Sequence, residues 1–238
     1  MFDTHSHKTG KIKLILAGSE MSDSEKNILK AKDNNNVWAA VGIHPQVEVE
    51  NIDKTIDKLD KLIANNKEWV VAVGECGLDY SESKTENQER LFRGQIALAL
   101  KYDLPLIIHA RKAVDEVIEI LASYKNTRGV FHCFAGGKKR VAKVLALGEN
   151  WYFGIDGNLT YEVGLEEVVK IIQKDRLVLE TDSPYLTPEP HRGEENKPEY
   201  VKFVYKKTAE VWGLSFDRTE KIIDKNATKL FGLGSQSK

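Results

Sequence analysis

The stretch WVVAVGECGLDY, residues 69–80, sets the pattern for the chain, because an apolar run leads directly into a carboxylate, Glu75. The run at 69–74 is nearly continuous in Val and Ala, which is typical of a parallel strand buried on both faces. Similar short runs predict seven further strands, at 2–5, 13–17, 37–43, 104–109, 129–134, 151–155 and 176–181.

Amphipathic stretches separate most of these runs and predict helices at 22–34, 52–65, 84–102, 113–124, 138–147 and 161–173. The segment 198–231 is helical apart from a break at Gly213, with Ser215 as the next N-cap. Eight strands with intervening helices predict a TIM-type (β/α)8 barrel, and a doubly wound open sheet is the alternative. No linker rich in Pro, Gly or Ser divides residues 1–238, so we expect a single domain.

The composition excludes several classes of protein. With 35 Lys and Arg against 36 Asp and Glu, the formal net charge is −1, so the chain is not expected to coat nucleic acid through bulk positive charge. Two cysteines cannot form a disulfide framework, and they favour a reducing compartment. No apolar run approaches the roughly 20 residues of a membrane span, and the start lacks the features of a secretion signal. We therefore expect a cytoplasmic protein without a membrane partner.

Six side chains that can bind metal fall at or just after predicted strands: His5, His7, Glu75, His109, His132 and Asp182. Active sites of α/β barrels lie at the carboxyl ends of the strands. Residues two apart on a strand point the same way, so His5 and His7 can converge on one ion. Burying imidazoles and carboxylates among apolar strands is costly unless they are paired or bind metal. The set therefore predicts a metal site.

The predicted ligands offer nitrogen and oxygen but no thiolate. Cys76 and Cys133 each follow a candidate ligand directly, so on a strand each points away from the site, and we interpret both as small buried hydrophobic residues. Four imidazoles and two carboxylates are too many for one tetrahedral ion. They suit two divalent ions with a bridging carboxylate and open positions for water.

The motifs FDTHSH, VGIHP, VGECGLDY, IIHAR, FHCF, ETDSPYL, PHRG and NATKLF occur in this order. From Phe2 to about Leu233, the chain closely resembles the TatD-like metal-dependent deoxyribonucleases of the amidohydrolase superfamily. The resemblance implies hydrolysis of phosphodiester bonds in DNA, with Mg²⁺ or Mn²⁺ as the two ions and Zn²⁺ as an alternative.

The resemblance also implies a role for each ligand. His5, His7 and Asp182 bind the first ion, Glu75 bridges to the second ion, and His109 and His132 complete the second site, as residues matched to the family motifs. Glu75 and Asp182 are the expected catalytic residues, because Asp182 is placed to orient the attacking water or to take its proton.

Weaker candidates for substrate contact surround these ligands: His191 and Arg192 in PHRG, Arg111 after His109, Tyr80 after Glu75, and His44 in VGIHP. Arg192 can fork onto a phosphate, or it is a solvated loop charge. Arg111 meets phosphate or forms a salt bridge. Tyr80 can stack on a base or order the loop after Glu75. The ring of His44 can face the cleft, or it can hydrogen-bond to a metal ligand, and both interpretations stay open. The near-neutral charge favours local binding of DNA, at single-stranded or frayed ends.

The chain departs from the family pattern between the first two strands. Only residues 8–12 separate H-x-H from the second strand, where the family has a loop and a helix. These residues span about 17 Å when fully extended. A parallel second strand requires the chain to run back along the length of the first strand, so residues 8–12 can make this connection only as a taut strap. We predict a barrel that lacks its first outer helix, with an antiparallel second strand as the competitor. We also expect a more open cleft beside His7, and an apolar flank covered by another helix or by the partner in a homo-oligomer.

Two rival functions remain. The same ligands would serve an amidohydrolase-type hydrolase of a small-molecule or aminoacyl ester or amide, since a fold does not fix a substrate. The PHRG motif favours phosphate. A binding protein that kept the fold without catalysis is disfavoured, because such a protein loses ligands and all six are present.

Overall fold

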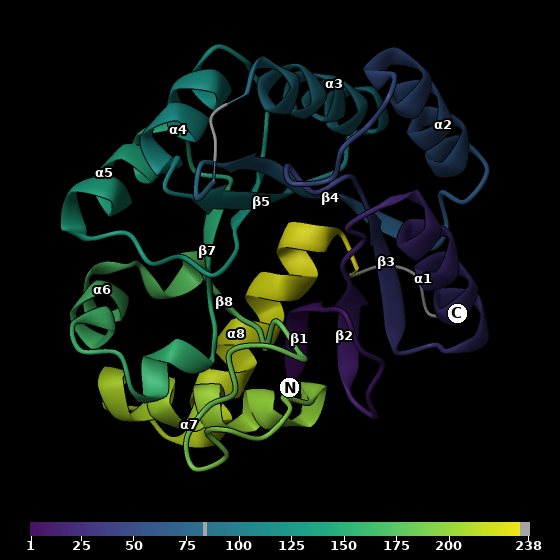
Figure 1. Cartoon of the computed structure of the whole chain (residues 1–238). Coiled ribbons are helices and arrows are strands. Elements are labelled where there is room, and N and C mark those ends of the chain that lie inside the picture. The colour runs from purple at the N-terminus through teal and green to yellow at the C-terminus, as the bar shows by residue number, and fades with distance from the viewer. Residues whose placement is uncertain (83–84, 234–238) are drawn as a thin grey trace.

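Eight parallel strands form a nearly closed barrel in the computed structural model, which describes residues 1–82 and 85–233 (Figure 1). The strands are β1 (Phe2–Ser6), β2 (Lys13–Leu16), β3 (Val37–Val41), β4 (Val70–Asp79), β5 (Leu106–Arg111), β6 (Gly129–Phe131), β7 (Trp151–Ile155) and β8 (Leu177–Leu179). They pair in chain order. Beyond β8, the backbone N–H of Asp182 donates to the carbonyl oxygen of His5 and closes the ring against β1. The predicted barrel is confirmed.

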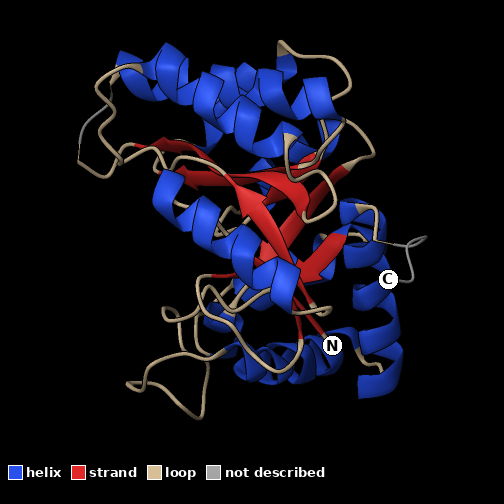
Figure 2. Cartoon of the chain, turned by 90° about the vertical axis from the view of Figure 1, so that its right-hand side faces the viewer, coloured by secondary structure: helices blue, strands red, loops and turns tan. Residues whose placement is uncertain are grey.

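Helices surround the strands (Figure 2). They are α1 (Met21–Asp33), α2 (Ile52–Ala64), α3 (Glu86–Tyr102), α4 (Val114–Ala122), α5 (Lys138–Ala146), α6 (Leu165–Ile171), α7 (Val201–Trp212) and α8 (Phe216–Phe231), with the 3-10 turns η1 (Gly157–Thr160), η2 (Lys174–Arg176) and η3 (Pro198–Tyr200). The predicted break at Gly213 is confirmed, and the Ser215 hydroxyl caps α8 by accepting from Arg218 N–H. Lys84, the predicted start of the third helix, lies outside the described residues. No helix in the described part of the chain is long and apolar enough to cross a bilayer.

Helix α8 closes the end of the barrel opposite the carboxyl ends of the strands. Its residues Ala227 and Leu230 share one buried cluster with Ile15 and Ala40 of the barrel interior and with Phe2 at the start of β1. In Figure 1 this helix, in yellow, runs toward the middle of the ring. Apolar side chains fill this end of the barrel. The polar side chains inside the barrel therefore gather at the other end, where the carboxyl ends of the strands lie.

Residues 7–12, between β1 and β2, contain no helix. The two strands are nevertheless parallel, with Phe2 opposite Lys13. The missing first outer helix is therefore confirmed, and the antiparallel alternative is wrong. The strap is fastened to the segment before α7, because Lys8 pairs with Glu195.

The flank that faces the missing helix is covered by the same chain. Leu14 and Leu16 of β2 are fully buried. On β1, the backbone nitrogen and oxygen of Phe2 each lie 3.0 Å from the hydroxyl of Tyr205, which belongs to α7. Helix α7 of the same chain therefore contributes to this cover, and a homo-oligomer through the flank stays a prediction.

Strand β4 continues to Asp79, whereas the prediction ended it at residue 74, so Glu75 lies within the strand and not at its end. A shift of register between Val73 and Cys76 interrupts the pairing with β5, which then resumes. At Gly77 a Cβ atom would lie 2.0 Å from the carbonyl oxygen of His109. Glycine at this position lets the two strands approach closely, which brings Glu75 to His109.

Candidate metal centre

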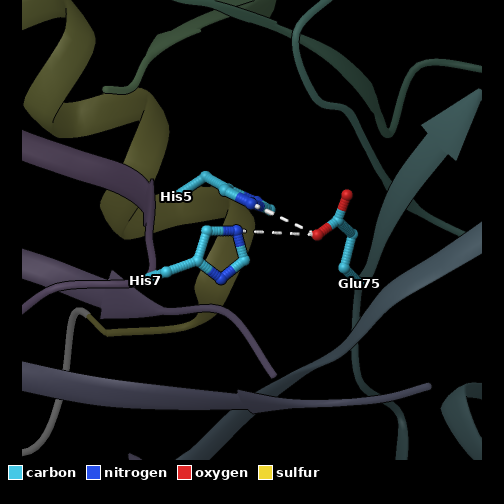
Figure 3. A group of neighbouring side chains, drawn as sticks. All are labelled: His5, His7 and Glu75. Carbon is cyan, nitrogen blue, oxygen red and sulfur yellow. Dashed lines mark ion pairs between the residues drawn. The ribbon is translucent and has the colours of Figure 1, made fainter. Parts of the chain in front are cut away.

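The carboxylate of Glu75 lies between two pairs of histidines. Its Oε1 atom is 2.8 Å from His109 Nδ1 and 2.8 Å from His132 Nε2. Its Oε2 atom is 3.6 Å from His5 Nε2 and 3.8 Å from His7 Nε2, and both rings point at this oxygen (Figure 3). The two oxygens of one carboxylate therefore face two different pairs of histidines.

Asp182 completes the group around His5 and His7. Its Oδ1 atom lies 3.5 Å from His5 Nε2 and 3.4 Å from His7 Nε2. These gaps, like those to Glu75, are long for hydrogen bonds. Nitrogen and oxygen ligands about 2.0–2.2 Å from one ion lie roughly 3.0–3.6 Å apart, so the spacing suits atoms that share an ion.

The burial of His5 gives a direct test of whether the site fits a metal. The side chain is fully buried, and neither ring nitrogen has a hydrogen-bond partner among the described residues. Two orphaned buried nitrogens are costly in an apoprotein. Burial also lowers the pKa of His5 to about 3, which keeps the ring in the neutral form that binds metal. The donor set therefore fits a metal ion.

Charge keeps the carboxylates of the site ionised. Burial alone would raise the pKa of Glu75, but the charge of His132 and the hydrogen bonds from His109 and His132 hold it well below its usual value. Burial also acts to raise the pKa of Asp182, but the interactions of its carboxylate with the nearby rings of His7 and His5 outweigh burial and lower that pKa. Both side chains are thus available as anionic ligands.

His44 and Asp79 lie beside the second ligand group. Asp79 Oδ2 is 3.0 Å from His109 Nε2, so this carboxylate orients the ring of His109. His44 Nε2 is 3.7 Å from Glu75 Oε1, and its ring packs edge-on to His109 with the centroids 4.3 Å apart. Burial lowers the pKa of His44 to about 4, so this ring too is neutral. The structure brings His44 to the cluster, and its role stays a prediction.

Glu180 is a residue of the site that the sequence prediction missed. Its side chain is fully buried, with Oε1 3.7 Å from His132 Nδ1 and accepting from the backbone N–H of Cys133. Burial raises the pKa of Glu180 to about 8. Gly154 makes room for it, because a Cβ there would lie 2.4 Å from Glu180 Oε2. The available signal was a carboxylate inside the apolar run LVLE, two positions before Asp182.

The two cysteines differ in environment. Cys76 is fully buried in the core, as predicted. The prediction is wrong for Cys133, because β6 ends at Phe131 and the alternation of a strand does not extend to it. Cys133 has a φ of 44°, lines the cavity over the cluster, and can group with His132 and Glu180 around an ion.

A cavity of about 930 Å³ opens over the ligands. Five of the six candidate ligands line it, namely His7, Glu75, His109, His132 and Asp182, and the lining also includes His44, Arg111, Lys112, Arg140 and Tyr185. Arg140 pairs with Asp115 at 3.2 Å. Within residues 1–82 and 85–233, no carboxylate pairs with Arg111 or Lys112. These two cations are therefore free to meet an anionic substrate.

Three predicted substrate residues, Tyr80, His191 and Arg192, are absent from the described lining of this cavity. The guanidinium of Arg192 lies 3.6 Å from the centroid of the Tyr161 ring. The ring of His191 stacks on Tyr200 with the centroids 4.2 Å apart. These contacts hold the PHRG loop against the protein, and a part in substrate binding stays a prediction for all three residues.

Comparison with known proteins agrees with the geometry. Residues 2–232 match the family model described as TatD related DNase, and the chain belongs to this family of metal-dependent hydrolases. It is 33% identical over 255 residues to the uncharacterized metal-dependent hydrolase YabD of Bacillus subtilis, covering 97% of this chain and 98% of that protein. It is 30% identical over 242 residues to the 3′-5′ ssDNA/RNA exonuclease TatD of Pantoea ananatis, covering 97% and 92%. The crystal structure of YjjV, a TatD homolog from Escherichia coli K12, matches with a TM-score of 0.89 at 27% identity over 97% of each chain.

Proposed function

We propose that the protein is a deoxyribonuclease that hydrolyses phosphodiester bonds with two divalent ions. The observation that supports this most is the division of the Glu75 carboxylate, with Oε2 toward His5 and His7 and Oε1 toward His109 and His132. Two-metal hydrolases need a ligand that spans both ions and keeps their charges together.

His5, His7 and Asp182 would hold the first ion, His109 and His132 would hold the second, and Glu75 would contribute to both sites. The carboxylates of this set suit Mn²⁺ and Mg²⁺, and its imidazoles suit transition metals, so Zn²⁺ is also compatible with it. When bound, such ions acidify a water molecule and stabilise the charge that develops on the oxygens of an in-line displacement.

Asp182 is the proposed proton acceptor. Its carboxylate is ionised, lies on the cavity wall, and is fixed by the donation of its own backbone N–H to His5. It orients the attacking water and takes its proton. Asp79 holds the ring of His109 in place from the other side. At the rim, Arg111 and Lys112 bind substrate phosphates, since neither is paired within the described chain.

The proposed substrate is DNA with a single-stranded or frayed end. The formal net charge of −1 gives no extended positive surface on which a duplex could lie. The cations of Arg111 and Lys112 instead provide local attraction at one cavity. The name of the Pantoea relative, a 3′-5′ ssDNA/RNA exonuclease, supports a nucleic-acid strand as the substrate class.

Incubation with end-labelled DNA tests this function. Single strands, frayed duplexes and closed circular duplex are compared with Mg²⁺ or Mn²⁺, with and without a chelator. We expect cleavage that needs metal, that favours open ends, and that is abolished in His132→Ala but retained in Lys206→Ala, an exposed cation on α7. Equal cutting of closed circles would refute the end preference. Hydrolysis of aryl esters without cleavage of any DNA would favour the small-molecule amidohydrolase.

A further inference from the structure

Tyr185 exposes its aromatic ring at the mouth of the cavity. Its side chain is 62% exposed, and it lines the cavity close to Asp182. The centroid of its ring lies 6.3 Å from that of His7, in an edge contact. Within the described part of the chain its hydroxyl has no hydrogen-bond partner. Folding of this chain therefore does not account for an aromatic ring at this place.

The backbone holds this ring in a fixed position. The N–H of Tyr185 donates to the carbonyl oxygen of Asp182 at 2.8 Å. The side chain of Asn196, fully buried, donates from one amide nitrogen to the carbonyl oxygens of both Tyr185 and Thr181. A side chain on such an anchored segment has little backbone freedom to lose when a ligand packs against it.

Other tyrosines of the same loops have their faces occupied. Arg192 lies over Tyr161, and His191 stacks on Tyr200. Within residues 1–82 and 85–233, no cation packs on the ring of Tyr185, and its one ring contact is the T-shaped contact with His7, which can occupy at most one of its two faces. A flat apolar face is thus open to a ligand.

The short strap between β1 and β2 leaves this side of the cavity open. Residues 7–12 contain no helix, and the side chain of His7 remains 22% exposed next to Tyr185. A ligand that packs on Tyr185 therefore has both the ring and the ligands of the first ion within reach.

We propose that Tyr185 is the stacking platform for the nucleobase beside the scissile phosphate. The inference rests on the proposed nuclease function and adds the part of the substrate that the metal centre does not recognise. A ring that is fixed, exposed and next to the reacting phosphate is what base stacking requires, and every base has a face that can stack. The base on Tyr185 places its phosphate toward His7 and Asp182.

The test compares two single-stranded oligonucleotides on the metal-loaded enzyme. Both oligonucleotides are labelled at the end that the enzyme cleaves. They differ in one residue at that end, which carries its base in one substrate and is abasic in the other. For the wild type and Tyr185→Phe we expect the abasic substrate to raise KM roughly tenfold, with kcat changed much less, as for the loss of one stacked base. In Tyr185→Ala the ratio of the two KM values should fall toward one. Leu29→Ala removes an equally exposed apolar side chain from α1, 60% exposed, and should keep the wild-type ratio.

Three results would overturn the proposal. The first is a wild-type enzyme that cleaves DNA but does not distinguish the intact end from the abasic end, which would leave the nuclease function standing. The second is a Tyr185→Ala variant, folded by circular dichroism, that keeps the wild-type ratio. The third is a wild-type enzyme that cleaves no DNA at all, and in that case the proposed function fails as well.

Discussion

The hydroxyl groups of Ser6 and Ser183 lie 2.8 Å apart in the closed seam between β1 and the segment after β8. Both side chains are fully buried. Ser6 lies between His5 and His7 in the sequence, and Ser183 follows Asp182 directly. The hydroxyl of Ser6 also accepts from the backbone N–H of Lys8 and donates to its carbonyl oxygen, at 3.0 and 2.7 Å. A single pair of serines therefore couples candidate ligands from opposite ends of the chain to the start of the strap.

Removal of this hydroxyl should destabilise the seam. Ser6→Ala leaves the Ser183 hydroxyl and the Lys8 N–H with one partner fewer in a buried environment, so we expect a loss of about 1–3 kcal/mol in the free energy of unfolding. Denaturant unfolding of metal-free protein measures it. Ser22→Ala, which removes an exposed hydroxyl that contacts Glu20, should change stability by less than about 0.5 kcal/mol. Equal losses in the two variants would contradict the role of the seam.

Metal should stabilise the fold through His5. Both nitrogens of this buried ring have no hydrogen-bond partner in the described chain, and an ion provides a partner for one of them. Binding at about 100 times Kd adds about 2.7 kcal/mol per site, or roughly 5–10 °C in Tm for a chain of this size. Thermal unfolding with and without Mn²⁺ checks this. In His5→Ala, the part of the rise in Tm that comes from the first ion should be lost.

A matched histidine gives the control for this measurement. His191 stacks on Tyr200 outside the described cavity lining, so His191→Ala should keep the full response to Mn²⁺. A wild-type protein whose Tm does not respond to Mn²⁺, Mg²⁺ or Zn²⁺ would show that these residues hold no ion.

Removal of the Glu75 carboxylate should lower the affinity for both ions, whereas removal of one histidine should lower the affinity for one ion. Glu75 faces both ligand groups, so Glu75→Ala removes a shared negative charge and leaves two cations to repel each other. His109→Ala should affect the second ion alone. Titration with Mn²⁺ followed by metal analysis should give two ions per chain in the wild type and in Glu119→Ala, an exposed carboxylate on α4. Two ions bound to Glu75→Ala with wild-type affinity would exclude the bridge.

The sequence predicted the parts of this molecule that depend on local pattern. Apolar runs identify all eight strands, and the position of the candidate ligands at or just after the ends of most runs identifies the end of the barrel at which they meet. The strap at residues 8–12 was predictable because the reach of an extended chain is a fixed length. Such features need no knowledge of which distant residues become neighbours.

Features that depend on distant neighbours were not predictable. The contact of Arg192 with Tyr161 joins two separate loops. Residue type alone left a phosphate contact and a solvated loop charge equally open for Arg192, and the PHRG pattern favoured phosphate. The length of β4 depends on its pairing with β5, which continues past Gly77. The burial of Glu180 depends on the space that Gly154 leaves on the next strand.

Arg111 should contribute to substrate binding through charge. It lines the cavity and is unpaired within the described residues. Arg111→Ala should raise KM for single-stranded DNA and reduce the slope of log K against log salt by about 0.7, the value for one phosphate contact on a single strand. Lys206→Ala should keep both values, and Arg192→Ala should have the smaller effect because its guanidinium lies on Tyr161. An unchanged salt slope in Arg111→Ala would show that Arg111 does not contact a substrate phosphate.

The last prediction concerns the strap that begins at His7. A Cβ atom at Gly10 would lie 2.7 Å from Pro198 Cβ, closer than packed atoms approach. Residues 8–12 form a connection too short to absorb the displacement, so Gly10→Ala should shift His7. The affinity for the first ion should then fall roughly tenfold, as it does when a metal ligand loses a residue that supports it. Calorimetric titration with Mn²⁺ measures this, with the second ion as the internal reference. Gly137→Ala, where an added Cβ meets nothing within 4 Å, should leave both affinities unchanged. Wild-type binding of both ions by a folded Gly10→Ala protein would show that the strap does not position His7.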